Sequence, residues 1–122
     1  MTWEPELEEL ARRTELAQQM GGAEKVERHR AQGKLTVRER IDALLDAGTF
    51  HEVGALTGRA TYDDHGNLIG VTPANFVMGR GRVEGRPIVV GGDDFTVRGG
   101  AADASIRGKQ VQSEQIDRKS TL

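Results

Sequence analysis

Apolar side chains recur at three- and four-residue steps over the first twenty residues. They are Trp3, Leu7, Leu10, Ala17 and Met20, with acidic residues early in the segment and arginines following. This spacing puts them on one face and predicts an amphipathic surface helix. Gly21 and Gly22 should end it. Residues 23–32 are highly charged with few apolar positions, and we expect a solvated helical connector there.

The next segment carries the signature of a helix N-terminus. Thr36 is followed three residues later by Glu39. This pattern predicts a capping box, in which each side chain accepts a hydrogen bond from the other residue's backbone N–H. The apolar stripe of this third helix would consist of Ile41, Leu44 and Leu45. Residues 46–48, Asp-Ala-Gly, should stop the helix.

The clearest β pattern lies at residues 75–83 and 86–91. These two runs are separated by Glu84 and Gly85, a two-residue turn of the X-Gly type, and they predict a β-hairpin. One face should carry Val77, Gly79, Gly81 and Val83 with Ile88 and Val90, and the other Arg80 and Arg82. Three weaker elements complete the prediction: a short extended segment at 49–56, an exposed turn at 62–67 and a weak helix from 101 to about 119.

A pair of glycines, Gly99 and Gly100, follows the second strand of this hairpin and opens the last predicted helix. Glycine has no Cβ and adopts positive φ, so main-chain N–H groups there can approach a ligand oxygen, and a helix N-terminus adds donors and partial positive charge. An acyl, carboxylate or phosphate oxygen is therefore a plausible neighbour. The alternative is that the two glycines only turn a tight strand-to-helix corner.

Other candidate sites have simpler explanations. The glycines of the hairpin have the wrong spacing for a dinucleotide fingerprint. The histidines (His29, His51, His65) are scattered without metal-ligand spacing, and no nucleophile has an adjacent base. Asp93 and Asp94 could bind a cation or act as a base, but they fit better as caps of the turn before Phe95. We therefore assign no catalytic residue and no metal ligand.

Composition narrows the classes of function. The 122 residues have a net charge of −2, with 17 basic and 19 acidic residues mixed along the chain, which does not favour binding to nucleic acid or to an anionic membrane. There is no cysteine, no apolar run of membrane-spanning length and no secretory signal, so a cytoplasmic protein is expected. Hydrophobic residues make up only 36%. The core should therefore be small, and the chain marginally stable without a partner surface.

Four blocks of sequence, taken in order, resemble a known family. They are residues 33–46 (GKLTVRERIDALLD), 48–52 (GTFHE), 83–90 (VEGRPIVV) and 94–100 (DFTVRGG). These blocks are similar to the N-terminal signature of the carboxyltransferase (β) subunits of biotin-dependent acyl-CoA carboxylases, the propionyl-, acetyl- and methylcrotonyl-CoA carboxylase group. The resemblance reaches to about Gln115.

This resemblance implies an α/β, crotonase-like fold of repeated strand-strand-helix units. Residues 1–48 would form an N-terminal helical arm, and residues 49–122 part of the crotonase-like N-domain. Family members move a carboxyl group from carboxybiotin, carried on a partner, to an acyl-CoA. Expected partners are thus acyl-CoA, a biotin carboxylase or biotin carrier subunit, and further carboxyltransferase subunits in a homo-oligomer; the chain would bind no cofactor directly.

The chain departs from the family pattern in length. Family members have several hundred residues, and the glycine-rich loops that form their oxyanion holes lie downstream of anything present here. Residues 116–122 do not lead into the expected apolar strand. We therefore expect a truncated half-domain that is inactive alone, with Arg98, Gly99 and Gly100 near the acyl-CoA. The alternatives are a non-catalytic assembly module and a degenerate fragment.

Overall fold

The computed structural model describes residues 2–100 and 104–120. Within these residues three helices come first: α1 (Glu4–Gln18), α2 (Ala23–Ala31) and α3 (Val37–Leu44). Five strands follow: β1 (His51–Val53), β2 (Gly58–Tyr62), β3 (Leu68–Pro73), β4 (Phe76–Val83) and β5 (Arg86–Asp93). A 3-10 turn, η1 (Arg98–Gly100), precedes the last helix, α4 (Ala104–Ser120). The helices expected near residues 3–20, 23–32, 36–45 and 101–119 are thus confirmed, although residues 101–103 lie outside the described part.

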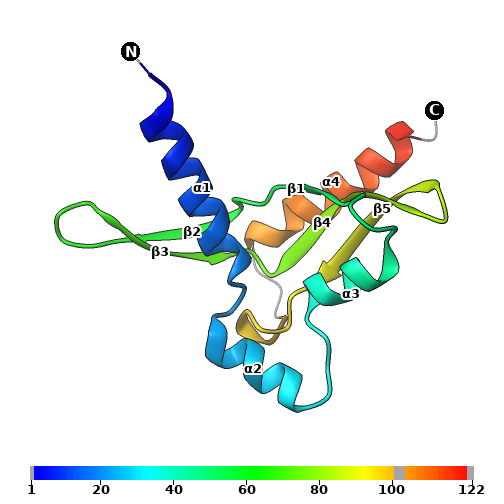
Figure 1. The fold of residues 1–122 in the computed structure, drawn as a ribbon, viewed down its shortest axis with the longest axis horizontal. Helices are drawn as coiled ribbons and strands as arrows, with labels where there is room; N and C mark the ends of the chain where they lie inside the picture. Colours follow the sequence, from blue (N-terminus) through cyan, green and yellow to red (C-terminus); the bar gives the residue numbers. More distant parts are fainter. Residues whose placement is uncertain (1, 101–103, 121–122) are drawn as a thin grey trace.

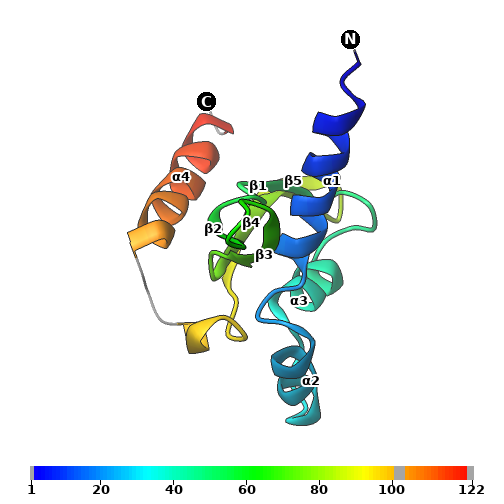
Figure 2. The ribbon, with the colours of Figure 1, turned by 90° about the vertical axis from the view of Figure 1, so that its left-hand side faces the viewer.

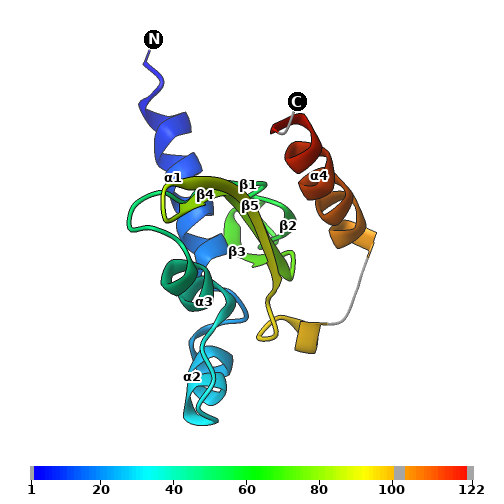
Figure 3. The ribbon, with the colours of Figure 1, turned by 90° about the vertical axis from the view of Figure 1, so that its right-hand side faces the viewer.

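Strand β4 is the centre of a three-stranded antiparallel sheet with the order β1-β4-β5. The predicted hairpin register is confirmed, because Gly79 pairs with Val90 and Gly81 pairs with Ile88. Figures 2 and 3 show α4 on one side of the strands and α1 and α3 on the other. The sheet is therefore the middle of three layers, and α2 lies beyond its end (Figure 1).

The two-residue turn of this hairpin is fixed by the end of α3. Glu84 and Gly85 have φ values of 51° and 80°, the left-handed pair that a type I′ turn requires. The Asp46 carboxylate accepts hydrogen bonds from both backbone N–H groups, at 2.9 and 2.8 Å. The residue that stops α3 thus also holds the tip of the β4–β5 hairpin.

Strands β2 and β3 form a second, two-stranded sheet, which the sequence pattern does not predict. Its connection is the predicted exposed turn, where Asp63 Oδ1 accepts from the backbone N–H of His65 and Asn67. These bonds favour the ionised carboxylate and lower the pKa of Asp63, the Asn67 N–H bond having the largest effect. The strands were missed because β2 is largely exposed and lacks an alternating apolar pattern.

The core is small, as expected. One cluster consists of Val37, Ile41, Leu45 and Val77, and it joins α3 to the sheet. A second cluster, Phe76 and Met78, lies on the α4 side. Because α3 shares its core with β4 and β5, the helical arm and the sheet are physically continuous, and the division at residue 48 stays a prediction.

The apolar stripe of α1 is mostly uncovered. Ala17 is buried, but Trp3, Leu7 and Leu10 are 72%, 61% and 49% exposed. The C-terminal half of the helix packs on β3, and Arg12 donates to the Leu68 carbonyl at 2.7 Å. The N-terminal half projects past the sheet (Figure 1).

Helix α4 packs against the sheet through a buried lysine. Lys109 is 7% exposed, and its Nζ donates to the Phe76 carbonyl at 2.7 Å. Burial disfavours the charged ammonium and lowers the pKa of Lys109, while nearby Glu52 acts in the opposite direction. This contact connects the last helix to the second apolar cluster.

Candidate functional site

The connection from β5 to α4 is built on two buried polar side chains. Asp94 and Thr96 are 2% and 6% exposed. Asp94 Oδ1 accepts hydrogen bonds from the Thr96 backbone N–H at 3.0 Å and from the Thr96 hydroxyl at 2.6 Å. The backbone carbonyl of buried Asn75 accepts a hydrogen bond from the Asp94 backbone N–H at 2.8 Å. The loop is therefore held rigidly at its start, and Asp94 caps the turn as predicted.

Thr96 also connects this loop to the helical arm. The Gly21 N–H, between α1 and α2, donates to Thr96 Oγ1 at 3.0 Å. A Cβ on Gly21 would overlap the Thr96 carbonyl, so only glycine permits this approach. A chain of hydrogen bonds thus runs from Gly21 through Thr96 to Asp94, and it holds the start of α2 beside the loop.

The loop ends in three consecutive left-handed residues. Arg98, Gly99 and Gly100 have φ values of 49°, 59° and 73°. This conformation is easy for glycine but costs about 1–3 kcal/mol for a residue with a Cβ. Strain of this kind at an exposed arginine is typical of a position where the side chain serves a function.

Gly99 and Gly100 differ in what surrounds them. The Gly100 N–H donates to the Val97 carbonyl at 3.0 Å, so that donor is already engaged within the turn. A Cβ on Gly100 would lie 3.2 Å from the Phe95 ring, whereas one on Gly99 would meet open space. Gly100 thus makes room for Phe95, and Gly99 exposes backbone to the solvent.

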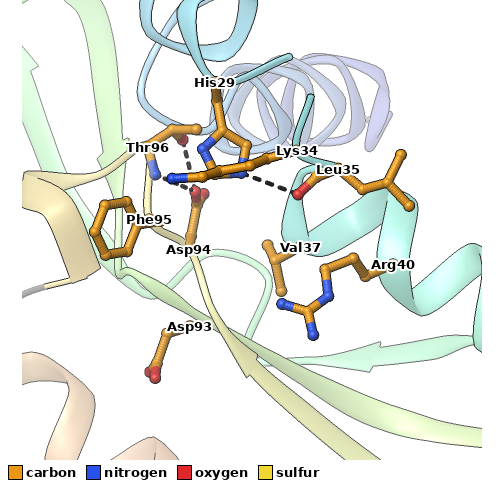
Figure 4. A pocket seen from close by; sticks show the side chains of 9 residues that line it. All are labelled: His29, Lys34, Leu35, Val37, Arg40, Asp93, Asp94, Phe95 and Thr96. Atoms are coloured by element: carbon orange, nitrogen blue, oxygen red, sulfur yellow. Dashed lines mark hydrogen bonds between the residues drawn. The ribbon is translucent and has the colours of Figure 1, made fainter. Parts of the chain in front are cut away.

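Two of the cavities that border the loop share His29, Phe95 and Thr96 in their lining. The larger, of about 510 Å³, is also lined by Lys34, Leu35, Val37, Arg40, Asp93 and Asp94 (Figure 4). The smaller, of about 280 Å³, is also lined by Lys25, Arg28, Gln32, Arg98 and Gly99. The larger cavity is mixed in charge, whereas the residues of the smaller one that the structure describes include basic groups and no carboxylate.

Phe95 lies at the boundary of the two cavities. Its side chain is 59% exposed, which is unusual for a phenylalanine. The Lys34 ammonium lies 5.8 Å from the ring centroid and the His29 ring 6.4 Å from it. His29 is held in place because its Nε2 lies 2.9 Å from the Leu35 carbonyl. The loop therefore presents an exposed aromatic ring beside a lysine and a histidine.

The structure brings together two of the three residues proposed to lie near a ligand. Arg98 and Gly99 line the smaller cavity, whereas Gly100 leaves room for the Phe95 ring. Lys25, Arg28 and Phe95 were not predicted as site residues. A charged helix gives no sign of which face it uses, and the Gly21–Thr96 contact that helps to bring α2 to the loop joins residues far apart in the sequence.

The family model for the carboxyl transferase domain matches residues 28–121, and the chain belongs to that family. The methylmalonyl-CoA carboxyltransferase 12S subunit of Propionibacterium freudenreichii subsp. shermanii is 39% identical over 117 residues, covering 92% of this chain and 21% of that protein. The propionyl-CoA carboxylase beta chain of Cereibacter sphaeroides is 40% identical over 100 residues, covering 78% of this chain and 19% of that one.

Solved structures agree with these relatives. A transcarboxylase 12S crystal structure, described as a hexamer with methylmalonyl-coenzyme A and methylmalonic acid bound, matches with a TM-score of 0.79 and 36% identity, over 94% of this chain and 22% of that one. A single-chain, multi-domain long-chain acyl-CoA carboxylase matches with the same TM-score and 26% identity, over 96% of this chain and 13% of that one. The resemblance and the partial crotonase-like fold are thus confirmed. The chain spans about a fifth of the length of the curated relatives it matches.

Two further observations concern membrane-spanning helices and metal-binding groups. Among residues 2–100 and 104–120, no helix is long and apolar enough to cross a membrane. Over the same residues, histidine and carboxylate side chains form no group of three that could hold a metal ion.

Proposed function

We propose that this chain forms the N-terminal part of a carboxyltransferase that moves a carboxyl group from carboxybiotin, carried on a partner subunit, to an acyl-CoA. The observation that carries the proposal is the loop of residues 94–100, because the family's sequence block coincides with a rigid, strained turn beside a basic cavity. Relatives named for methylmalonyl-CoA and propionyl-CoA support an acyl-CoA substrate.

In this proposal Arg98, Gly99 and Gly100 lie close to the acyl-CoA. Arg98 would meet a phosphate, the exposed Gly99 backbone would allow close approach, and Gly100 would keep the turn in shape. Carboxyl transfer of this kind depends on positioned N–H donors that stabilise developing negative charge. We propose that further polypeptide supplies those donors, with residues 1–48 as the arm and residues 49–122 as part of the catalytic domain. We assign no residue here to biotin.

Complementation tests this function. A related carboxyltransferase subunit is produced without the segment that matches this chain, and the 122-residue chain is added in trans together with a biotin carboxylase and carrier. We expect carboxylation of propionyl-CoA only when both pieces are present. Carboxylation by the chain without its complement would refute its proposed dependence on further polypeptide. Failure of the combined pieces to associate or react would contradict the proposed function.

The exposed half of α1 favours a second candidate, a non-catalytic assembly module. Trp3, Leu7 and Leu10 would pack against a carboxylase subunit while the cavities stay unused. Titration calorimetry distinguishes the two functions. Millimolar or tighter binding of propionyl-CoA favours the carboxyltransferase function, whereas no heat with propionyl-CoA and clear association with a carboxylase subunit favours the assembly module.

A further inference from the structure

We propose that two copies of this chain pair through the exposed half of helix α1, with the two helices antiparallel. The contact would centre on Leu7 and Leu10 of each copy, and Glu6 of one copy would face Arg13 of the other. This inference goes beyond the proposed function and does not depend on it. It also gives the exposed half of α1 a different occupant from the carboxylase subunit of the assembly module.

The apolar residues of α1 have the spacing of a helix-pairing face. Alternating steps of four and three residues separate Trp3, Leu7, Leu10, Thr14 and Ala17. Steps of this kind define the a and d positions along which two helices pack. Ala17 is buried within the molecule and Thr14 is partly buried, whereas the stripe is open to solvent from Trp3 to Leu10. The Thr14 hydroxyl already donates to the Leu10 carbonyl at 2.8 Å, so it can enter an apolar contact without losing a hydrogen bond.

A different face of α1 holds the helix to the rest of the molecule. Arg12 donates to the Leu68 carbonyl at 2.7 Å, and Arg13 donates to the Tyr62 hydroxyl at 3.1 Å, so these bonds run to β3 and β2. With a turn of about 100° per residue, Arg12 lies about 140° around the helix from Leu7. Leu7 therefore does not face the β2–β3 sheet. The half of α1 that carries the open stripe projects past the strands (Figure 1), where a second copy can reach it.

The charges beside the stripe favour the antiparallel orientation. Glu6 and Arg13 are seven residues apart, so they lie on the same flank of the stripe. In an antiparallel pair centred on the two leucines, Glu6 of each copy faces Arg13 of its partner, which gives two ion pairs of opposite charge. In a parallel pair the same two positions would face Ala11 and Gln18, which are uncharged. The surface is thus complementary to itself in one orientation.

Arg13 is already positioned for such a contact. Its Nε and Nη2 donate to Glu9 at 3.1 and 2.9 Å, and Nη2 also donates to the Tyr62 hydroxyl. These bonds hold the side chain beside the stripe, and the guanidinium carries further donors on Nη1. Glu6 is exposed. Exposed ion pairs add little affinity, but they distinguish one orientation from another.

Sedimentation of the 122-residue chain at several concentrations tests the pairing. We expect an equilibrium of monomer and dimer with a Kd on the order of 100 µM, because three large apolar side chains per copy make a small interface. Leu7→Ser should raise this Kd at least about tenfold, since it removes a central apolar contact. Leu44→Ser removes a similarly exposed leucine from α3 and is the matched control, with an unchanged Kd. A chain that is monomeric at about 1 mM, or equal Kd values for the two variants, would overturn the proposal.

Exchange of charges tests the orientation. Glu6→Arg and Arg13→Glu each place like charges opposite one another, so each variant alone should dimerise about fivefold more weakly. An equimolar mixture of E6R and R13E restores both ion pairs with the charges exchanged, and it should regain the Kd of the parent. Glu8→Arg makes the same change of charge away from the stripe and should leave the Kd unchanged. No weakening by E6R, or no recovery in the mixture, would overturn the antiparallel pairing.

A carboxylase subunit is the competing occupant of this face. A chain that stays monomeric but binds a carboxylase subunit, with that binding lost in Leu7→Ser, would overturn the pairing and support the assembly module. Dimerisation of a chain that fails the complementation test would refute the proposed function and leave the pairing standing. An active complemented enzyme formed from a chain that is monomeric on its own would refute the pairing and leave the function standing.

Discussion

Thr36 begins α3 through two reciprocal hydrogen bonds. Its hydroxyl accepts from the Glu39 N–H at 3.2 Å, and Glu39 Oε1 accepts from the Thr36 N–H at 3.0 Å. Thr36 is only 1% exposed, so water cannot replace the lost bond. This cap fixes the helix whose side chains Val37 and Ile41 form half of the main apolar cluster.

We predict that Thr36→Ala lowers the free energy of unfolding by about 1 kcal/mol, the usual contribution of a helix cap. Urea denaturation followed by circular dichroism measures the change. Thr36→Ser keeps the hydroxyl and serves as the control. Its loss in the free energy of unfolding should be less than about half that of Thr36→Ala. Equal losses for serine and alanine would show that packing of the threonine methyl group matters more than the cap.

Glu39, the partner of Thr36 in this cap, should make the stability of the chain depend on pH. The pKa of Glu39 lies below its ordinary value of 4.5, first because the Thr36 N–H donates to the carboxylate and then because Arg30 lies 3.2 Å away. A carboxyl whose pKa is lower in the folded state contributes stability above its unfolded pKa. That contribution disappears as the pH falls through the folded value. Glu39 should therefore stabilise the chain at pH 6, and this contribution should decrease as the pH falls below 4.5.

Glu39→Gln tests this sign. The amide keeps an acceptor for the Thr36 N–H but does not titrate, so we expect the variant to be less stable than the parent at pH 6, by a difference that shrinks as the pH falls below 4.5. The measurement is the urea midpoint at several pH values across this range. Glu27→Gln, at an exposed residue of α2, is the control and should leave the pH profile unchanged. A constant difference between E39Q and the parent at all pH values would contradict the prediction.

At the scale of elements, the close approach of β1 to β4 depends on Gly79. Its pairing partner is Glu52, and a Cβ at residue 79 would overlap the His51 carbonyl and lie 2.6 Å from the Phe50 ring. The obstacle is partly backbone, so no side-chain rotation can relieve it. Strand β1 has only three residues, so few other hydrogen bonds hold it in the sheet.

We predict that Gly79→Ala costs at least about 1 kcal/mol and loosens β1 from the sheet, because overpacking against backbone forces the strand to move. Hydrogen exchange of the β1 and β4 amides, together with a thermal melt, measures this. Gly70→Ala, also in a strand but with open space at its Cβ position, should change stability by less than about 0.5 kcal/mol. Similar behaviour of the two variants would refute the steric explanation.

At the scale of the whole molecule, the described residues leave much apolar surface uncovered. Trp3, Leu7, Ile69 and Phe95 are each more than half exposed, and the two buried clusters are small. Chains that bury little apolar area have little to offset the loss of conformational entropy. The chain should therefore be marginally stable without further polypeptide.

A urea melt of the chain checks this expectation. We predict a midpoint below about 2 M, corresponding to a free energy of unfolding under about 2 kcal/mol at a slope near 1 kcal/mol/M. Addition of the complementary segment of a related carboxyltransferase should raise the midpoint, since a partner that binds only the folded form stabilises it. A cooperative transition at 4 M urea without any partner would contradict the prediction.

Local patterns predicted much of the fold. Thr36 and Glu39 fixed the start of α3, and Glu84 with Gly85 fixed the hairpin register, because both motifs act over two to four residues. Strands β2 and β3 were not predicted, since neither carries a clear alternation. The spacing of the apolar residues in α1 showed which of them share a face, but not whether anything covers that face.

The amino-acid sequence by itself determined the family, the capped helix, the central hairpin and the position of the glycine turn, because each depends on neighbouring residues. Only the tertiary structure showed which groups surround that turn. Gly21 and Thr96, 75 residues apart, bring the basic face of α2 beside Phe95 and Arg98. Contacts between distant residues depend on how the chain packs in three dimensions, and no local pattern in a single sequence records them.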